Sequence, residues 1–291
     1  MSIAWDMQRR DQTSLGVTSI IGAISWRSRL SKAYDRWKVD FDQYCDNAAV
    51  GGDIPLTVEW KVFAAAYRAV YHAAQALLHM EFLDLQIYAG ARHILGRPVQ
   101  QQDYVRSSRI VKKWATKERE RAAVASWHAA SLIYEIAALK ERDQDSLSER
   151  RRLFTTTYTN LFHVPWCLYL ATLTAWAFHH ARPLRQSHEA ATRAHLDILQ
   201  NFSEDEDDSS DEIVWDAQRE MEALVKEMAS YNGVKDASSR TLSGQGRKGT
   251  HGLVWVVADL LSTVRWGIVH AGVSVLRGLV PTRLINQYED S

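Results

Sequence analysis

Hydrophobic residues recur at helical spacing along most of this chain. In the first such segment, steps of three, four or seven residues separate the large apolar side chains Trp26, Leu30, Trp37, Phe41 and Tyr44. This spacing places them on one face of a helix, whose other side carries charged residues such as Arg29, Lys32 and Asp35. The pattern ends near the segment 47–55, whose two adjacent glycines and proline predict a loop.

The same periodicity predicts further helices at about 60–78, 103–115, 116–139, 185–202, 213–231 and 253–279. A short helix is expected to start at an Asp84 cap and to stop at Gly96, with Pro98 reinforcing the stop. Pro165 is suited to the first turn of another helix, and Pro281 closes the last one.

Two segments of the C-terminal third lack this periodicity. The tract 204–212 reads EDEDDSSDE and is acidic, whereas 234–251 is basic and contains several Gly and Ser residues. Neither offers enough apolar surface to offset the entropy of ordering, so we expect both to be exposed and flexible. The predicted organisation is a helical core at 1–202, an acidic tract, helix and flexible linker at 203–251, and a C-terminal helix packing on the core at 252–291.

The composition favours an all-α fold. Of the 291 residues 46% are hydrophobic, Gly (14) and Pro (5) are sparse, and strong helix formers abound. A chain of this length can bury roughly 70–75% of its unfolded surface in one domain. We predict a single multi-helix bundle-like domain. Most tryptophans fall on apolar stripes and are expected to pack in the core, including Trp37, Trp60, Trp127, Trp176 and Trp255.

The segment between Arg152 and Arg182 carries no Asp, Glu, Lys or Arg, which makes it the candidate for a membrane span. A spanning helix needs about 20 predominantly apolar residues. Here several threonines, an asparagine and His163, His179 and His180 interrupt the apolar run. A buried core helix is the better interpretation, and no membrane contact is predicted. The charged N-terminus also lacks the apolar segment of a signal peptide.

An acidic motif is the strongest hint of enzymatic chemistry. Asp207-Asp208-Ser209-Ser210-Asp211 matches the DDxxD pattern and resembles the magnesium–diphosphate site of terpene synthases, which are also all-helical. Hard oxygen ligands suit Mg²⁺. That chemistry needs a second acidic motif on a facing helix, and no NDxxSxxxE-like segment is present. The tract is better interpreted as a solvated charge run, with an all-helical Mg-dependent isoprenoid enzyme as the alternative.

No other group of residues indicates catalysis or a resident cofactor. Cys45 and Cys167 are the only cysteines, so neither a disulfide framework nor a cysteine zinc site is available. The 11 histidines include no HExxH pair, and His128 is expected to be a hydrogen-bonded core or rim residue. GxSxG and P-loop motifs are absent too. We therefore predict no enzyme activity and no catalytic, cofactor-binding or metal-ligating residue in this chain.

Several segments together resemble one protein family. They are the apolar helix from Trp60 to Leu78, IYAGARHILGRPV at 87–99, the Trp114-Ala115-Thr116 break, Trp127-His128-Ala129-Ala130, FHVPWCLYLATLTAWAF at 162–178, and the run from Leu253 through VLRGLVPTRLINQYE. With these segments the chain resembles the fungal-specific transcription factor domain, the all-helical regulatory region that follows a zinc-cluster or C2H2 zinc-finger module in many fungal regulators.

The resemblance implies a nuclear protein that regulates RNA polymerase II transcription. In that family specific DNA contact and zinc belong to fingers upstream of the helical region, and this chain lacks the Cys or Cys–His sets that such fingers need. Its formal charge is zero, with 35 basic and 35 acidic residues, so it has no cationic excess for binding phosphates. We expect DNA contact only through an upstream module, zinc only if that module exists, and a second copy or transcriptional co-regulators as partners. A helical scaffold or dimerisation module is a further alternative.

Overall fold

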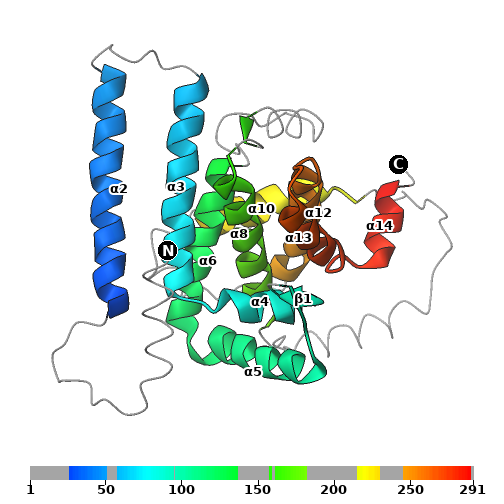
Figure 1. The fold of residues 1–291 in the computed structure, drawn as a ribbon. Helices are drawn as coiled ribbons and strands as arrows, with labels where there is room; N and C mark the ends of the chain where they lie inside the picture. Colours follow the sequence, from blue (N-terminus) through cyan, green and yellow to red (C-terminus); the bar gives the residue numbers. More distant parts are fainter. Residues whose placement is uncertain are drawn as a thin grey trace, which may run out of the picture.

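The computed structural model describes residues 26–50, 58–94, 96–136, 157–158, 161–181, 215–229 and 245–289. Ten helices fall in these ranges, beside a small hairpin of β1 (His93–Ile94) and β2 (Arg97–Pro98). The prediction of an all-α, bundle-like fold is confirmed, and Figure 1 shows the helices gathered around α8 with α2 at one side. The helix predicted at 185–202 and the acidic tract at 204–212 lie outside the described residues.

Helix α8 (His163–His180) lies in the middle of the bundle. It packs against α6 (Arg119–Ile136), α3 (Val58–Leu78) and α12 (Gln245–Ser262), and nearly all of its side chains are buried. Neighbours on several sides explain why this segment has no charged residue, since a buried ion would need a partner. The interpretation as a buried core helix is confirmed. No helix among the described residues is long and apolar enough to cross a membrane.

Small side chains let α3 and α6 approach each other closely. The buried alanines of the two helices are Ala64, Ala65, Ala66, Ala69, Ala73, Ala74 and Ala76 on α3 and Ala122, Ala123, Ala125, Ala129 and Ala130 on α6. Larger residues such as Leu132 and Leu168 fill the space toward α8. One face of α3 is thereby anchored in the core, and its opposite face is available to α2.

The short helix predicted from Asp84 to Gly96 ends earlier than expected. Helix α4 spans Phe82–Tyr88, and Asp84 lies inside it, after an N-cap at Glu81. Gly96 has a φ of 78° in the turn of the β1–β2 hairpin. Glycine adopts this left-handed conformation without strain, so Gly96 forms a hairpin turn and does not end a helix. The Asp84 carboxylate accepts a hydrogen bond from Ser107 Oγ at 2.6 Å, which fastens α4 to α5 (Gln101–Lys117).

The C-terminal third departs most from the prediction. Helix α12 begins at Gln245, inside the segment expected to be a flexible linker as far as His251, and Thr250 is fully buried. Gly252 lies so close to α10 (Ala217–Ala229) that an added Cβ would be 2.3 Å from the Ala217 carbonyl oxygen. Hydrophobic periodicity cannot reveal the start of this helix, because the residues that face α10 there are glycines.

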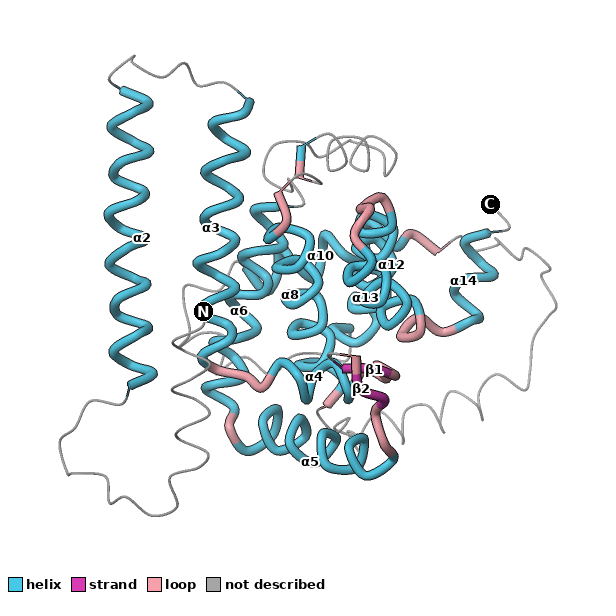
Figure 2. The backbone as a smooth tube through the Cα atoms, viewed as in Figure 1, coloured by secondary structure: helices cyan, strands magenta, loops and turns pink. Residues whose placement is uncertain are grey.

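The last predicted helix, 253–279, is two helices. Helix α12 ends at Ser262, and α13 (Gly267–Arg277) starts after Trp266, which is its N-cap. Figure 2 shows this connection as a loop, and α14 (Thr282–Glu289) follows Pro281. The apolar periodicity continues across the break because residues on both sides of it, such as Leu261 and Val269, belong to the same core.

Candidate functional site

A helix on the outside of the bundle carries the most unusual surface of the described residues. Helix α2 (Trp26–Val50) lies beside α3, which is its principal neighbour, and it continues past position 47, where a loop was predicted to begin (Figure 1). Four polar residues and one buried cysteine, spaced by four and three positions, face α3: Ser31, Asp35, Lys38, Asp42 and Cys45. We call these five residues the polar stripe of α2.

Asp35 is the first anchor between α2 and α3. Its Oδ1 accepts a hydrogen bond from the Tyr71 hydroxyl at 2.8 Å and another from Gln75 Nε2 at 2.6 Å. Gln75 Nε2 also donates to the backbone oxygen of Ser31 at 3.1 Å. Tyr71 and Gln75 are buried, so these bonds satisfy polar groups that have little access to water. Burial, and then the hydrogen bond to Asp35, raise the pKa of Tyr71, which remains a donor at neutral pH.

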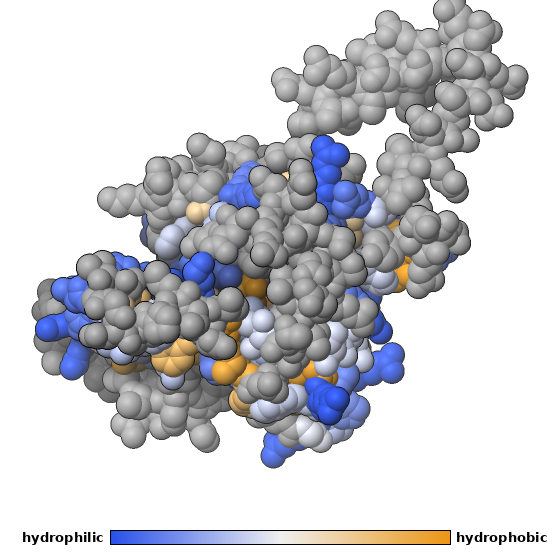
Figure 3. All heavy atoms as spheres, turned by 90° about the horizontal axis from the view of Figure 1, so that it is seen from above, coloured by the Kyte–Doolittle hydropathy of each residue, from blue (hydrophilic) through white to orange (hydrophobic). Residues whose placement is uncertain are grey.

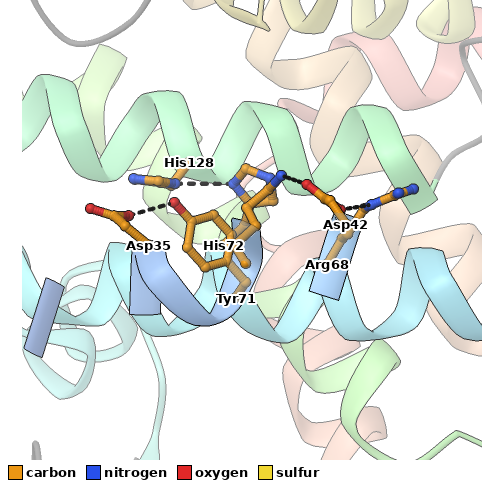
Figure 4. Close-up of polar contacts among 7 residues, drawn as sticks. Asp35, Asp42, Arg68, Tyr71, His72 and His128 are labelled. Atoms are coloured by element: carbon orange, nitrogen blue, oxygen red, sulfur yellow. Dashed lines mark hydrogen bonds and ion pairs between the residues drawn. The ribbon is translucent and has the colours of Figure 1, made fainter. Parts of the chain in front are cut away.

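Asp42 is the second anchor. It accepts a hydrogen bond from Arg68 Nε at 3.0 Å and forms an ion pair with Lys38, one turn away on α2. Burial opposes its ionisation, but the hydrogen bonds from Lys38 and Arg68 outweigh that effect and lower the pKa of Asp42. The Lys38 ammonium also lies 5.7 Å from the centre of the Tyr71 ring. Figure 4 shows these side chains bridging the two helices.

Two histidines meet next to this network (Figure 4). His72 Nδ1 on α3 and His128 Nδ1 on α6 lie 3.0 Å apart, and both residues are buried. A hydrogen bond between these two atoms requires a hydrogen on one and a lone pair on the other, so at least one ring is neutral. Burial, followed by the neighbouring His72 and His79, lowers the pKa of His128 to about 2. The expectation that His128 is a hydrogen-bonded core or rim residue is confirmed.

This histidine pair is suited to structure and not to proton transfer. A general acid or base works best with a pKa near the operating pH, which is far above that of His128. Burial also raises the pKa of Cys45, and that of Cys167 to about 12, which makes both thiols poor nucleophiles. Among the described residues no group of three or more His, Cys, Asp or Glu side chains is placed to hold a metal ion. Asp207 and Asp208 lie outside those residues.

The apolar stripe of α2 runs beside the polar stripe. It consists of Leu30, Tyr34, Trp37, Phe41 and Tyr44. Each of these residues precedes a residue of the polar stripe by one position and therefore lies about 100° from it around the helix. Trp37 is 40% exposed and Tyr44 is 55% exposed. The prediction that Trp37 packs in the core is therefore wrong. The hydrogen-bonding and charged groups of α3, Arg68, Tyr71 and Gln75, pair with the polar stripe, which leaves the apolar stripe half uncovered.

Aromatic rings of α3 extend this apolar surface. Trp37 stacks on Phe41 with 5.1 Å between ring centroids, and Phe41 lies 5.8 Å from Tyr67. Tyr44 lies 5.9 Å from Trp60. We define the aromatic face as the six rings Trp37, Phe41, Tyr44, Trp60, Phe63 and Tyr67.

Exposure of this kind is typical of protein-binding surfaces. Phe63 is 39% exposed and Tyr67 is 40% exposed, so four of the six rings reach solvent substantially. Aromatic side chains are enriched at protein–protein interfaces because they bury a large area at a small entropic cost. Figure 3, viewed from above, shows hydrophobic residues at the surface among hydrophilic ones. The chemistry of this exposed surface is therefore that of a protein-contact surface.

The remaining predicted core tryptophans differ in burial. Trp176 is buried, as expected. Trp60, Trp127 and Trp255 are half-buried, and Trp255 packs against the core. The polar stripe was not predicted from the sequence, although its spacing of four and three residues was a usable signal. Polar residues at that spacing on a helix with a second, apolar stripe indicate two contact faces.

Two curated proteins are similar to this chain. The nicotinate catabolism cluster-specific transcription factor of Emericella nidulans is 36% identical over 282 residues, which are 96% of this chain and 27% of that protein. The zinc finger protein klf1 of Schizosaccharomyces pombe is 24% identical over 256 residues, 88% of this chain and 27% of that protein. The chain thus spans about a quarter of the length of both relatives. No family model and no solved structure matches it.

Proposed function

We propose that this chain is a regulatory helical domain that does not itself contact DNA. Along 96% of its length it is homologous to a region of a fungal transcription factor. The observation that carries the proposal is the extent of this similarity, which covers the described core and the aromatic face together. The resemblance recognised in the sequence is confirmed by it. Control of RNA polymerase II transcription and a place in the nucleus are part of the proposal.

The charge and the metal-binding capacity of the chain support a role away from DNA. The formal net charge is zero, so the domain has no excess of cations to displace counterions from a phosphate backbone. Zinc fingers need closely spaced Cys or Cys–His ligands, whereas Cys45 and Cys167 are buried at distant positions of the chain. We assign zinc and base-specific contacts to a different module of the whole regulator.

The aromatic face supports a role in protein binding. Aromatic residues are enriched at protein–protein interfaces, and the exposed rings of α2 and α3 provide a surface of this chemistry. Four described histidines have a shifted pKa: His79, His128, His163 and His251. Burial lowers the pKa of each, so none of these four is tuned for acid–base catalysis at neutral pH.

A reporter assay tests the regulatory role. Residues 1–291 fused to an unrelated sequence-specific DNA-binding domain should change transcription of a cognate reporter in a fungal host, relative to that DNA-binding domain alone. The matched control is the same fusion with Leu168→Asp, which places a charge at a fully buried position of α8 and should abolish the effect. Equal reporter output from the fusion, the control and the DNA-binding domain alone would refute the regulatory role.

A binding assay tests the absence of DNA contact. The purified chain should show no site-selective, nanomolar binding to a library of random duplexes at physiological salt, because it lacks the cationic excess that supplies most of such affinity. Enrichment of one sequence motif by the chain alone would overturn this part of the proposal and leave the reporter result standing.

A further inference from the structure

We infer that the aromatic face is the interface of a symmetric homodimer, in which two copies of α2 pack antiparallel about a two-fold axis near the middle of the helix. The inference rests on the packing and the charges of α2 and does not depend on the proposed role in transcription. Three features of α2 identify a second copy of this chain as the occupant of the surface.

The first reason is the spacing of the apolar stripe. Leu30, Tyr34, Trp37, Phe41 and Tyr44 follow one another at steps of four, three, four and three residues. Apolar residues at this average step of 3.5 form the seam of two helices that pack side by side over several turns. Helix α3 occupies the neighbouring polar stripe, and its own rings Phe63 and Tyr67 only border the seam.

The second reason is that the far flank of the seam is open. On the side of the stripe that points away from α3, all residues are exposed: Arg29, Ala33, Arg36, Asp40, Gln43 and Asn47. Nothing in the described chain covers this flank, and Trp37 and Tyr44 beside it are 40% and 55% exposed. A second helix can therefore approach the seam without displacing any described element.

The third reason is that the charges of α2 complement those of the same helix reversed. Residues 26–38 contain five basic side chains and one acidic one, whereas residues 39–50 contain three acidic side chains and no basic one. Parallel copies would align like charges, but antiparallel copies set the basic half of each helix against the acidic half of the other. With the axis near position 38, Arg36 of one copy lies opposite Asp40 of the other, as an isologous contact requires.

The size of the surface is adequate for a specific dimer. A helix of 25 residues such as α2 is about 37 Å long. With a contact width of ~10 Å for each of α2 and α3, the face measures roughly 700 Å², close to the ~800 Å² that each partner buries in a standard interface. The four helices of the two copies would pack as a bundle around the aromatic rings.

Sedimentation velocity on the purified chain tests the inference. The wild type should convert from monomer to dimer as its concentration rises from about 1 to 100 μM, the range of a weak, non-obligate interface. Trp37→Asp and Tyr44→Asp should each raise the dissociation constant at least about tenfold, since central aromatic residues carry most of the energy of an interface. Circular dichroism, and the melting temperature at about 1 μM, where the wild type is monomeric, should stay unchanged. If Trp37→Asp misfolds, the more exposed Tyr44→Asp gives the answer.

Val39→Asp is the matched control. Val39 is 64% exposed on the same helix but lies about 200° around from Trp37, on the side opposite the seam. It should dimerise like the wild type. A wild type that stays monomeric over the whole range overturns the inference, and so does a dimer that Trp37→Asp and Tyr44→Asp leave intact.

Charge reversal tests the antiparallel arrangement. Arg36→Glu and Asp40→Arg should each weaken self-association, because each creates two like-charge contacts across the axis. An equimolar mixture of the two variants should restore wild-type association, since the introduced Glu at position 36 then faces the introduced Arg at position 40 at one contact and the native Asp40 faces Arg36 at the other. Single variants that associate as well as the wild type would exclude the antiparallel register.

Discussion

Acid should destabilise this domain because burial disfavours the protonation of its histidines. The expected loss of stability can be calculated for His128. The pKa of this ring falls from an ordinary 6.5 to about 2 in the fold. Above pH 6.5 the ring is neutral in both the folded and the unfolded chain, so it does not affect their balance. Below pH 6.5 the unfolded chain takes up a proton that the folded chain refuses, and stability falls by ~1.4 kcal/mol per pH unit until the folded ring itself titrates. At pH 5 the loss from His128 is therefore about 2 kcal/mol.

The test compares the wild type with His128→Gln in urea unfolding at several pH values between 7.5 and 5. Glutamine keeps a polar group toward His72 but has no proton to gain, so the variant should lose about 2 kcal/mol less than the wild type over this interval. Titrating groups distant from His128 contribute equally to both proteins and cancel in the difference. His79, whose pKa burial lowers to about 4, should behave similarly in His79→Gln. Parallel profiles for wild type and His128→Gln would refute the claim that burial keeps His128 neutral.

Two further predictions concern packing. Gly252→Ala should destabilise the fold by about 1–3 kcal/mol, because the added Cβ would lie 2.3 Å from the Ala217 carbonyl oxygen. Gly267→Ala is the control, since its Cβ would have no neighbour within 4 Å. Thermal unfolding should distinguish the two variants, and an unchanged melting temperature for Gly252→Ala would contradict the close contact of α10 and α12. Asp35→Ala removes the acceptor of two hydrogen bonds and should loosen α2 by about 1–2 kcal/mol. Hydrogen exchange should then accelerate in α2 and stay slow in α8, with the exposed Asp46→Ala on the same helix as control; equal acceleration in both helices would show that α2 is part of the cooperative core.

Local patterns in the sequence were sufficient for the helical class and for the most buried element. The segment around α8 has no charged residue on any side, and a helix surrounded by others in water tolerates that composition, so its burial could be predicted from residue types. Helix α3 was predicted from the spacing of its large residues, and its bounds of Val58 to Leu78 agree closely with that spacing. These features depend on neighbours three and four residues away, which the sequence displays directly.

Contacts between distant segments decided the rest. The start of α12 was invisible because Gly249 and Gly252 face α10, and a glycine carries no hydrophobic signal, although it permits the closest approach of two helices. The pairing of His72 with His128 joins positions 56 residues apart, and no local pattern specifies it. Helix α2 displays two stripes, polar and apolar, at the same spacing. The sequence alone determined that both exist. Only the tertiary structure decided that the polar stripe meets α3, because Arg68, Tyr71 and Gln75 supply partners there, and that the apolar stripe is left partly exposed.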